Sequence, residues 1–301
     1  MAAHEAPRGV LLVDKPSGIT SHDVVACARR ALNTRKIGHA GTLDPMATGL
    51  LILGVGAATR LLTFIVGLDK TYEATIRLGI ATDSDDADGA ETRRADAAAV
   101  AAVSGEAIER VVASLRGPIS QVPSTVSAIK VGGRRAYDLA RAGEQVELKA
   151  RQVTVSRFDV VDSRVGDGVL DLDVVVDCSS GTYIRALARD LGSALGVGGH
   201  LTALRRTRIG PFSVDAAVTD IAPDAVLVPD SEVAAAVLGA FAVSADEARD
   251  LRHGKRLVGA APRLDAPTRA AIDPDGRLVG IVERRGDDVK SVMNMAEEAG
   301  A

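Results

Sequence analysis

Aromatic residues are scarce in this chain of 301 residues, at 2%. It holds three Tyr, four Phe and no Trp, so its core must be built mainly from Leu, Val, Ile and Ala. Each tyrosine therefore stands out, and all three lie in segments that also carry charge: Tyr72, Tyr137 and Tyr183. They are the first candidates for a binding role. For Tyr72 the alternative is a strand residue that packs in the core.

Cysteines and long apolar runs are also rare. Cys27 and Cys178 have neither the spacing of metal ligands nor the pattern of a disulfide framework. Two buried free thiols in a reducing cytoplasm are the expected reading. The apolar residues 49–58 are far fewer than the roughly 20 that a membrane-spanning helix needs. Residues 1–8 lack the apolar region of a signal peptide. We therefore expect a cytoplasmic protein with no membrane attachment.

A large excess of charge is absent, since the net charge is −4, but the charges are unevenly distributed. Residues 82–110 carry eight acids against three arginines. Residues 125–157 carry seven bases against three acids, and residues 181–210 carry five arginines against one acid. Two basic segments in an acidic chain predict a local surface that faces phosphate groups. Charges scattered over solvated faces are the alternative.

The stretch at residues 38–49 has almost no secondary-structure period, because glycines and a proline interrupt both helix and strand across it. Its Asp44-Pro45 pair is typical of a β-turn. The apolar residues 50–53 would anchor that turn in a sheet. A rigid turn that presents Asp44 beside His39 is suited to a reactive site. Asp-Pro turns are also common as purely structural turns.

Residues 38–45, Gly-His-Ala-Gly-Thr-Leu-Asp-Pro, resemble the signature loop of the tRNA pseudouridine-55 synthases. The resemblance implies that Asp44 is the essential catalytic residue. It also implies the pseudouridine synthase fold, which is α+β with a central mixed, largely antiparallel sheet flanked by helices. Separate motifs extend the resemblance over about residues 9–212, in the order that the family shows.

Two of these motifs precede and follow the Asp44 loop. Residues 15–21 resemble a motif whose lysine, here Lys15, supports the catalytic loop from beneath; a surface turn residue is the alternative. Residues 70–79 alternate apolar and polar side chains, which predicts a half-buried strand. The resemblance implies that Tyr72 of this strand stacks on the target base and is placed to take the proton from C5. A stacked base gains roughly 1–3 kcal/mol.

The second decisive motif is Gly-Thr-Tyr-Ile-Arg, within residues 178–192. A strand is expected to end just before Thr182, which can cap a helix. Arg185 and Arg189 would then share one face of that helix. The resemblance implies that Arg185 pairs with Asp44. An arginine within a few ångströms favours the ionised carboxylate and fixes its orientation.

The basic segments supply the expected RNA contacts. A thumb-like insertion at about residues 124–150 combines a glycine hinge with a basic arm, as in a segment that grips RNA. An ordinary helix with a solvated basic face is the alternative. The resemblance implies contacts with substrate at Lys15, His39, Lys70, Tyr183, Leu204, Lys130, Arg134, Arg135, Arg141, Arg205, Arg206 and Arg208.

The expected domains are a catalytic domain at residues 1–230 and a small β-rich domain at residues 241–301. The second resembles the PUA RNA-binding domain in general character. An Asp-Gly pair at residues 275–276 lies between apolar runs, which predicts a hairpin.

The resemblance implies that the chain converts uridine-55 in the T-arm of tRNA to pseudouridine. The base must be flipped out of its loop, and a carboxylate acts with no metal or cofactor. No obligate protein partner is evident. A tRNA-binding and tRNA-folding factor without chemistry is one alternative. A pseudouridine synthase acting on another RNA is the second.

Overall fold

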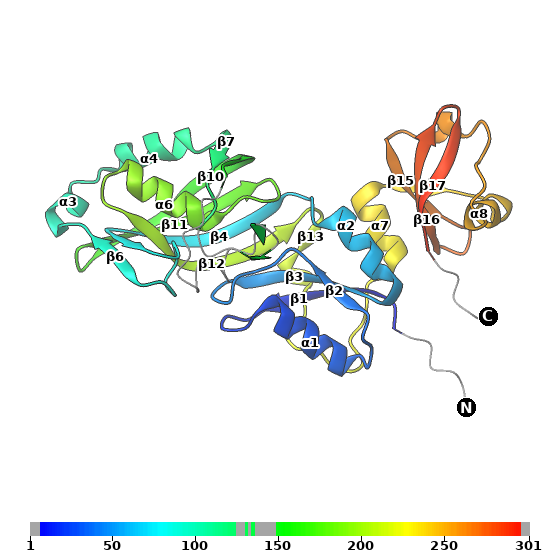
Figure 1. Ribbon diagram of the computed structural model, residues 1–301, viewed down its shortest axis with the longest axis horizontal. Helices are drawn as coiled ribbons and strands as arrows, with labels where there is room; N and C mark the ends of the chain where they lie inside the picture. The colour runs from blue at the N-terminus through cyan, green and yellow to red at the C-terminus, as the bar shows by residue number, and fades with distance from the viewer. Residues whose placement is uncertain (1–6, 125–129, 132–133, 136–148, 296–301) are drawn as a thin grey trace.

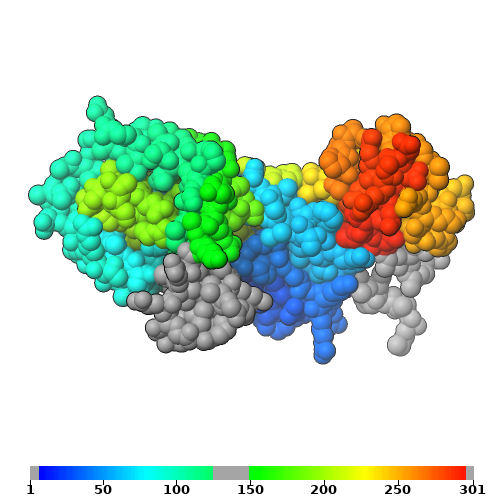
Figure 2. Space-filling view, turned by 45° about the horizontal axis from the view of Figure 1, so that its top comes forward, coloured from blue at the N-terminus to red at the C-terminus, as the bar shows by residue number. Residues whose placement is uncertain are grey.

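The computed structural model describes residues 7–124, 130–131, 134–135 and 149–295 (Figure 1). Over these ranges the chain forms a nine-stranded sheet, a four-stranded sheet and two two-stranded ribbons. The molecule is elongated (Figure 2), with the large sheet toward one end and the four-stranded sheet at the other (Figure 1).

The region of the large sheet holds the following elements in chain order: β1 (Gly9–Lys15), α1 (Ser21–Ala31), β2 (Ile37–Ala40), β3 (Thr48–Val55), η1 (Gly56–Leu61), α2 (Leu62–Ile65), β4 (Lys70–Leu78), β5 (Ile80–Thr82), β6 (Glu91–Arg94), α3 (Ala97–Ala101), α4 (Gly105–Ser114), β7 (Gly117–Gln121), β8 (Lys130–Val131), β9 (Arg134–Arg135), β10 (Arg151–Gly166), β11 (Val169–Cys178), α6 (Ile184–Ala194), β12 (Gly199–Ile209), β13 (Phe212–Ser213) and η2 (Val214–Ala216).

The large sheet has the strand order β1-β3-β12-β4-β11-β10-β7, with β2 added to β3 and β13 added to β12. Within the described part of the chain, its pairings are antiparallel except that of β3 with β12. The mixed, largely antiparallel sheet predicted from the sequence is therefore confirmed. Gly49 makes the parallel contact possible: its φ is +99°, and a Cβ there would lie 2.2 Å from the Arg206 carbonyl oxygen.

Helices α3, α4 and α6 cover one face of the large sheet (Figure 1). Strand β4 shows the alternation that the sequence predicts, with Tyr72, Ala74 and Ile76 facing the helices. The intervening residues face the opposite side, where Arg77 forms two hydrogen bonds with Asp171 on β11. That second face is therefore polar, and the core of this region lies between the sheet and α6.

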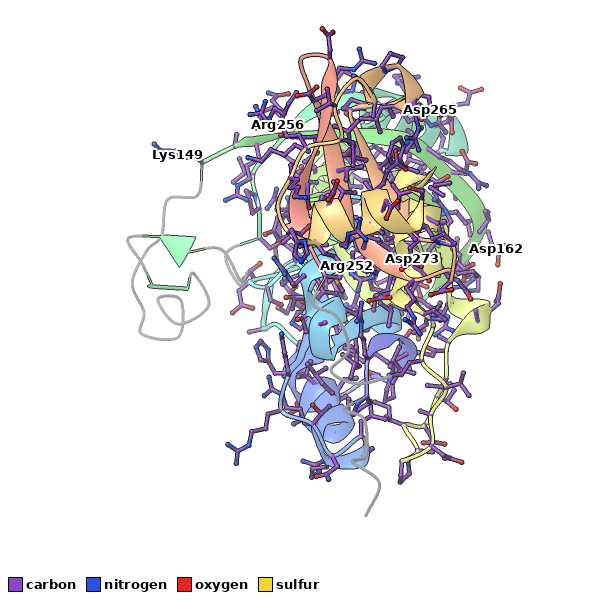
Figure 3. The ribbon with its side chains drawn as sticks, turned by 90° about the vertical axis from the view of Figure 1, so that its right-hand side faces the viewer. Lys149, Asp162, Arg252, Arg256, Asp265 and Asp273 are labelled. Atoms are coloured by element: carbon purple, nitrogen blue, oxygen red, sulfur yellow. The ribbon has the colours of Figure 1, made fainter. Side chains whose placement is uncertain are left out.

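The C-terminal region holds α7 (Asp230–Leu238), β14 (Ala240–Ala242), α8 (Ala245–Arg252), η3 (Ala261–Arg263), β15 (Thr268–Ile272), β16 (Leu278–Arg285) and β17 (Asp288–Asn294). The predicted hairpin is confirmed, because β15 and β16 pair antiparallel around Gly276. Asp273 accepts hydrogen bonds from the backbone N–H of Asp275 and of Arg277 in the turn. It also pairs with Arg252 of α8 at 2.7 Å, and Figure 3 shows the two side by side.

The small sheet shares an apolar core with the large one. Val233 of α7 packs in one cluster with Ile52 of β3, Ile65 of α2 and Ile281 of β16. The β-rich C-terminal region predicted from the sequence is confirmed, and helix α7 joins it to the rest of the chain through buried apolar contacts.

Several local expectations need correction. Residues 38–40 belong to strand β2, so the irregular loop spans only residues 41–47. Strand pairing with β3 tolerates Gly38 there, since its missing side chain leaves room for Leu62. Cys27 is exposed on α1, whereas Cys178 is buried as expected. Most of the expected insertion, including Tyr137 and Arg141, lies outside the described residues. In the part of the chain that the structure describes, no helix is long and apolar enough to cross a membrane.

Candidate active site

The loop at residues 41–47 forms the expected turn between β2 and β3. The Asp44 carbonyl oxygen accepts a hydrogen bond from the Ala47 N–H at 3.1 Å, which closes a β-turn with Pro45 at its second position. Leu43, just before the turn, is held by the Ser21 hydroxyl. That oxygen accepts from the Leu43 N–H at 2.9 Å and donates to the Leu43 carbonyl at 3.2 Å. Helix α1 therefore fixes one side of the loop.

Lys15 supports the loop from below, as the resemblance implies. Its side chain is fully buried, and Nζ donates to the carbonyl oxygens of Pro16 (2.9 Å), Ile19 (2.8 Å) and Pro45 (3.3 Å). Burial lowers the pKa of Lys15 to about 8, although the charge of Asp44 opposes the change. Lys15 thus positions the turn from beneath, and its expected contact with substrate stays a prediction.

Arg206 holds the loop from the sheet. Its side chain is 1% exposed, and it donates to the carbonyl oxygens of Leu50 at 2.9 Å and Gly41 at 3.1 Å. Arg206 is thus directed at the backbone of the loop, and its expected contact with phosphate stays a prediction. The parallel pairing of β12 with β3 places Arg206 opposite Gly49, and its guanidinium donates to carbonyl oxygens of β3 and of the loop.

Asp44 and Arg185 are brought together by the loop and helix α6. The Arg185 Nε lies 3.0 Å from the Asp44 Oδ2, which confirms the expected pair. The Arg185 side chain is 4% exposed and the Asp44 side chain 35%. Arg185 also donates through Nη1 to the Ser84 carbonyl oxygen at 3.1 Å and to the Asp86 carboxylate at 3.0 Å.

The pKa of Asp44 is raised above its ordinary value. Loss of solvent around the carboxylate is the largest cause, and the negative charges of Asp86 and Asp88 act in the same direction. Arg185 and Lys15 oppose the rise. Arg185 therefore favours the ionised carboxylate, as the sequence predicts, but burial outweighs its effect on the pKa of Asp44.

The helix that carries Arg185 begins differently from the prediction. Its N-cap is Tyr183 rather than Thr182, and the Thr182 hydroxyl donates to the Ser179 carbonyl instead. The half-buried Tyr183 is bound through its backbone to the side chain of Gln121. The fold thus brings a residue of β7 to the start of the helix.

The other predicted residues near the loop are mostly buried. Tyr72 is 7% exposed and faces the same side of the sheet as Leu204, which is also buried. Burial raises the pKa of the Tyr72 phenol, against the charge of Arg206. His39 meets His22 edge to face at 5.5 Å, and burial lowers its pKa. Lys70 is buried; its Nζ donates to the Val66 and Leu68 carbonyl oxygens, and burial lowers its pKa to about 8.

Arg205 and Arg208 lie on the opposite face of the sheet from Asp44. They line a groove of about 590 Å³ together with Thr71, Glu73, Arg157, Asp177, Thr207, Ser213, Val214 and Asp215. Arg205 pairs there with Asp14 at 2.7 Å, and Arg208 with Asp177 at 3.5 Å. The three arginines 205, 206 and 208 are therefore not gathered at one surface. Alternation along the strand separates Arg206 from Arg205, and the register shift between Arg206 and Arg208 in the pairing with β4 places Arg208 on the same face as Arg205.

The remaining predicted contacts lie in the insertion. Lys130, Arg134 and Arg135 belong to the short ribbon β8–β9, in which Lys130 pairs with Arg135. Arg141 lies outside the described residues. Within the described ranges, no group of three or more His, Cys, Asp or Glu side chains is arranged to hold a metal ion.

Asp86 is the site residue that sequence reasoning missed. It lies among the eight acids of residues 82–110, and the sequence alone assigns it no role. The structure buries Asp85 and Asp86 and pairs them with Arg189 and Arg185 respectively. The signal in the sequence was the repeat of arginines four residues apart on the helix, which calls for more than one acidic partner.

Solved structures share the fold of this chain. A chain from "Structure of H/ACA RNP bound to a substrate RNA containing 2'-deoxyuridine" superposes with a TM-score of 0.69 and 23% identity, over 97% of this chain and 86% of that chain. A chain from "Crystal Structure of a Cbf5-Nop10-Gar1 Complex" gives 0.66 and 24%, over 97% and 85%.

Sequence comparison assigns the family. Residues 29–184 match the TruB family pseudouridylate synthase N-terminal domain. Residues 185–231 match the tRNA pseudouridylate synthase B C-terminal domain, and residues 238–296 match tRNA pseudouridine synthase II, C-terminal. The tRNA pseudouridine synthase B of Leifsonia xyli subsp. xyli is 54% identical over 291 residues, 95% of this chain and 96% of the relative. That of Mycolicibacterium paratuberculosis is 52% identical over 291 residues, 96% and 97%. The chain belongs to the TruB family of pseudouridylate synthases and is an isomerase.

Proposed function

We propose that this enzyme isomerises uridine-55 in the T-arm of tRNA to pseudouridine, with Asp44 as the essential catalytic group. The observation that carries the proposal is the 3.0 Å pair of Asp44 and Arg185 on a turn held by Lys15, Ser21 and Arg206. The curated relatives that cover the whole chain are named tRNA pseudouridine synthase B, which supports tRNA as the substrate.

The isomerisation breaks the N1–C1′ bond of the nucleoside and joins C1′ to C5. The proton on C5 is released and N1 gains one, so no atom or electron is added overall. Asp44 can attack C1′, attack C6 or abstract a sugar proton, and each of these routes uses the ionised carboxylate. Arg185 favours that form and fixes the direction of the oxygen that reacts.

The neighbours of Asp44 suit a flipped base. Asp44 is more exposed than the residues that hold its turn, so the uridine would enter at Asp44. Its base would then meet the buried side chains of Tyr72 and Leu204. The raised pKa of Tyr72 disfavours its phenolate, which makes stacking on the base the better supported of its two expected roles. The lowered pKa of His39 favours the neutral ring, which can lie against an extruded nucleotide.

The basic insertion at about residues 124–150 would hold the RNA. The C-terminal domain, which we propose to be PUA-like, would make a second contact with it. The domain limits at residues 230 and 241 and the location in the cytoplasm belong to the same proposal. Arg205 and Arg208 contribute to this grip only if RNA also reaches the far face of the sheet, because their groove lies there.

Replacement of Asp44 by Asn tests the chemistry. The variant should release no tritium from tRNA labelled at C5 of uridine, while its affinity for that tRNA stays within about threefold, well under the roughly 1.4 kcal/mol that marks a tenfold change. Asp88→Asn is the matched control, since this exposed carboxylate makes no contact with Arg185 in the described structure and should leave turnover nearly intact. If the unsubstituted protein binds tRNA but releases no tritium, the result favours the alternative of a tRNA-folding factor without chemistry.

A second experiment tests the choice of RNA. An isolated T-arm hairpin should be modified at position 55, because single-stranded loops are recognised by local shape and splayed bases. A hairpin with cytidine at that position is the control and should release no tritium. Modification of ribosomal RNA with no activity on the hairpin would overturn the assignment to tRNA.

A further inference from the structure

Helix α6 does not cap its own beginning. Its N-cap residue Tyr183 forms no side-chain capping bond, and the preceding Thr182 hydroxyl turns back to Ser179. Gly181, one residue earlier, is exposed and has a φ of +88°. The first turn of the helix therefore takes its position from a partner elsewhere in the fold.

Gln121 is that partner. Gln121 is the last residue of β7 and is 1% exposed. Its side-chain amide forms two hydrogen bonds with the backbone of Tyr183. Its Oε1 accepts from the Tyr183 N–H at 2.8 Å, and its Nε2 donates to the Tyr183 carbonyl at 3.0 Å. A buried amide that both donates to and accepts from the Tyr183 backbone holds the start of the helix against the end of β7.

Arg189 fastens the same strand end to α6 at a second point. Its Nη2 donates to the carbonyl of Val122 at 2.8 Å, directly after Gln121, and its Nη1 pairs with Asp85 at 3.1 Å. Its Nε also bonds to the neighbouring Asp190 at 2.9 Å. Attachment at Tyr183 and at Arg189 prevents the helix from rotating about its axis without breaking one of the contacts.

Arg185 lies between the two attachment points on the same helix. Its guanidinium must reach Asp44 and Asp86 at the same time, at 3.0 Å each. A rotation of the helix that lengthened one of these contacts would also alter the orientation of the Asp44 carboxylate. A misplacement of about 1 Å at such a group can cost roughly 10²-fold in rate.

We propose that Gln121 and Arg189 are positioning residues for the isomerisation, because they fix helix α6 and with it the Arg185 guanidinium beside Asp44. They touch no reacting atom themselves. The inference rests on the proposed function, since it assigns them a role in the chemical step of that reaction.

The test compares the single-turnover rate at saturating T-arm hairpin with the affinity for the same RNA. Gln121→Met keeps the size of the side chain and removes both bonds to Tyr183. Arg189→Lys keeps the charge beside Asp85 and loses the branched reach to the Val122 carbonyl. Both variants should lower the rate, Gln121→Met by about 10²-fold, with RNA affinity unchanged.

A double-mutant cycle with Arg185→Lys separates positioning from general destabilisation. If Gln121 acts through Arg185, Gln121→Met should slow the Arg185→Lys enzyme far less than it slows the wild type. Arg93→Met is the matched control, because exposed Arg93 donates to the Gly196 carbonyl just beyond the other end of α6. Its rate should equal that of the wild type.

Equal losses of rate in the two backgrounds would overturn the inference, as would a full wild-type rate in both single variants. If Gln121→Met does not fold, as judged by its thermal transition, Arg189→Lys carries the same cycle. Failure of the wild-type enzyme to modify the hairpin would instead count against the proposed function, so the two outcomes are distinct.

Discussion

The Arg185 guanidinium joins two carboxylates, with Nε 3.0 Å from Asp44 and Nη1 3.0 Å from Asp86. Asp86 and Arg185 are both buried, while Asp44 is open to solvent on one side. The buried pair of Arg185 and Asp86 is a fixed support, and the partly exposed Asp44 is the member of the group that can meet a substrate. Substitution of one carboxylate leaves the other paired with Arg185 but changes the charge around it. Separate substitutions of Asp44 and Asp86 therefore test the role of each.

Arg185→Lys should lower the rate of isomerisation by roughly 10²-fold, with little loss of RNA binding. Lysine keeps the positive charge, but its single ammonium group cannot hold both carboxylates in the planar arrangement that arginine provides. Tritium release from C5-labelled tRNA measures the rate, and filter binding measures the affinity.

Arg77→Lys is the matched control for this substitution. Arg77 also binds a carboxylate through two nitrogens, at 2.8 and 2.7 Å from Asp171, but on the far face of the sheet. Its replacement should leave the rate unchanged and cost at most about 1 kcal/mol of stability. Equal losses of rate at both positions would show that the Asp44 pair has no special role.

Asp86→Asn should extend activity to lower pH. The negative charge of Asp86 raises the pKa of Asp44, so its removal makes Asp44 easier to ionise. Because the reaction uses the ionised carboxylate, the acidic limb of the rate profile should move toward lower pH, even where the maximal rate falls. Rates of tritium release measured across the acidic range give the position of this limb.

Asp88→Asn should move the same limb in the same direction but by less, since Asp88 has the smallest effect among the causes of the Asp44 shift. A limb that stays in place in the Asp86 variant, or moves toward higher pH, would contradict the assignment of that limb to Asp44.

Asp44→Asn should be inactive and yet at least as stable as the wild type at neutral pH. A carboxyl whose pKa is raised in the folded state binds more protons there than in the unfolded chain, so its contribution to stability falls as pH rises through that window. Ionised Asp44 therefore costs stability at neutral pH, and Asn carries no such cost. The difference should shrink as the pH falls toward the ordinary pKa of aspartate. Urea denaturation at several pH values measures it.

Asp273→Asn should show the opposite sign. Although burial opposes the change, Arg252 and the turn N–H groups lower the pKa of Asp273, so its carboxylate stabilises the fold above its ordinary pKa and loses this effect as the pH falls. The variant should be less stable than the wild type at neutral pH. A stability loss in Asp44→Asn as large as that in Asp273→Asn would argue against a strained Asp44.

The parts of the site that the sequence predicted are those carried by local patterns. The Asp44-Pro45 turn, the alternating strand of Tyr72 and the placement of Arg185 on a helix each depend on a few consecutive residues, and a family resemblance connected them. The pairing of Arg185 with Asp44 spans 141 positions and came from that resemblance alone, since no local pattern encodes it.

The parts that escaped prediction depend on tertiary burial. Asp86 resembles its exposed neighbours in sequence, and only the packing of its loop against α6 makes it a buried partner of Arg185. Arg206 was grouped with Arg205 and Arg208 because the three are close in sequence. Alternation along β12 turns Arg205 and Arg206 to opposite faces. The register shift between Arg206 and Arg208 then places Arg208 on the far face with Arg205, and no local sequence pattern shows this irregularity.

Gly49→Ala should destabilise the protein severely, by about 3 kcal/mol or more, because strain at a positive φ of roughly 1–3 kcal/mol adds to a backbone collision. The new Cβ would lie 2.2 Å from the Arg206 carbonyl oxygen and 2.8 Å from its backbone nitrogen. The pairing of β3 with β12 would have to open, and this pairing also places Arg206 under the catalytic turn. The midpoint and slope of urea denaturation report the loss.

Gly105→Ala is the control for the general effect of replacing a glycine. Gly105 is the first residue of α4, follows the N-cap Ser104, and has nothing within 4 Å of the position that a Cβ would take. Alanine there should be neutral or stabilising by up to about 1 kcal/mol, since it restricts the unfolded chain and favours the helix. If both variants changed stability by similar amounts, the close approach at Gly49 would not be what holds β3 and β12 together. A large loss at Gly49 alone, with the rate of isomerisation falling in parallel, would tie the support of the Asp44 turn to that single contact between two strands.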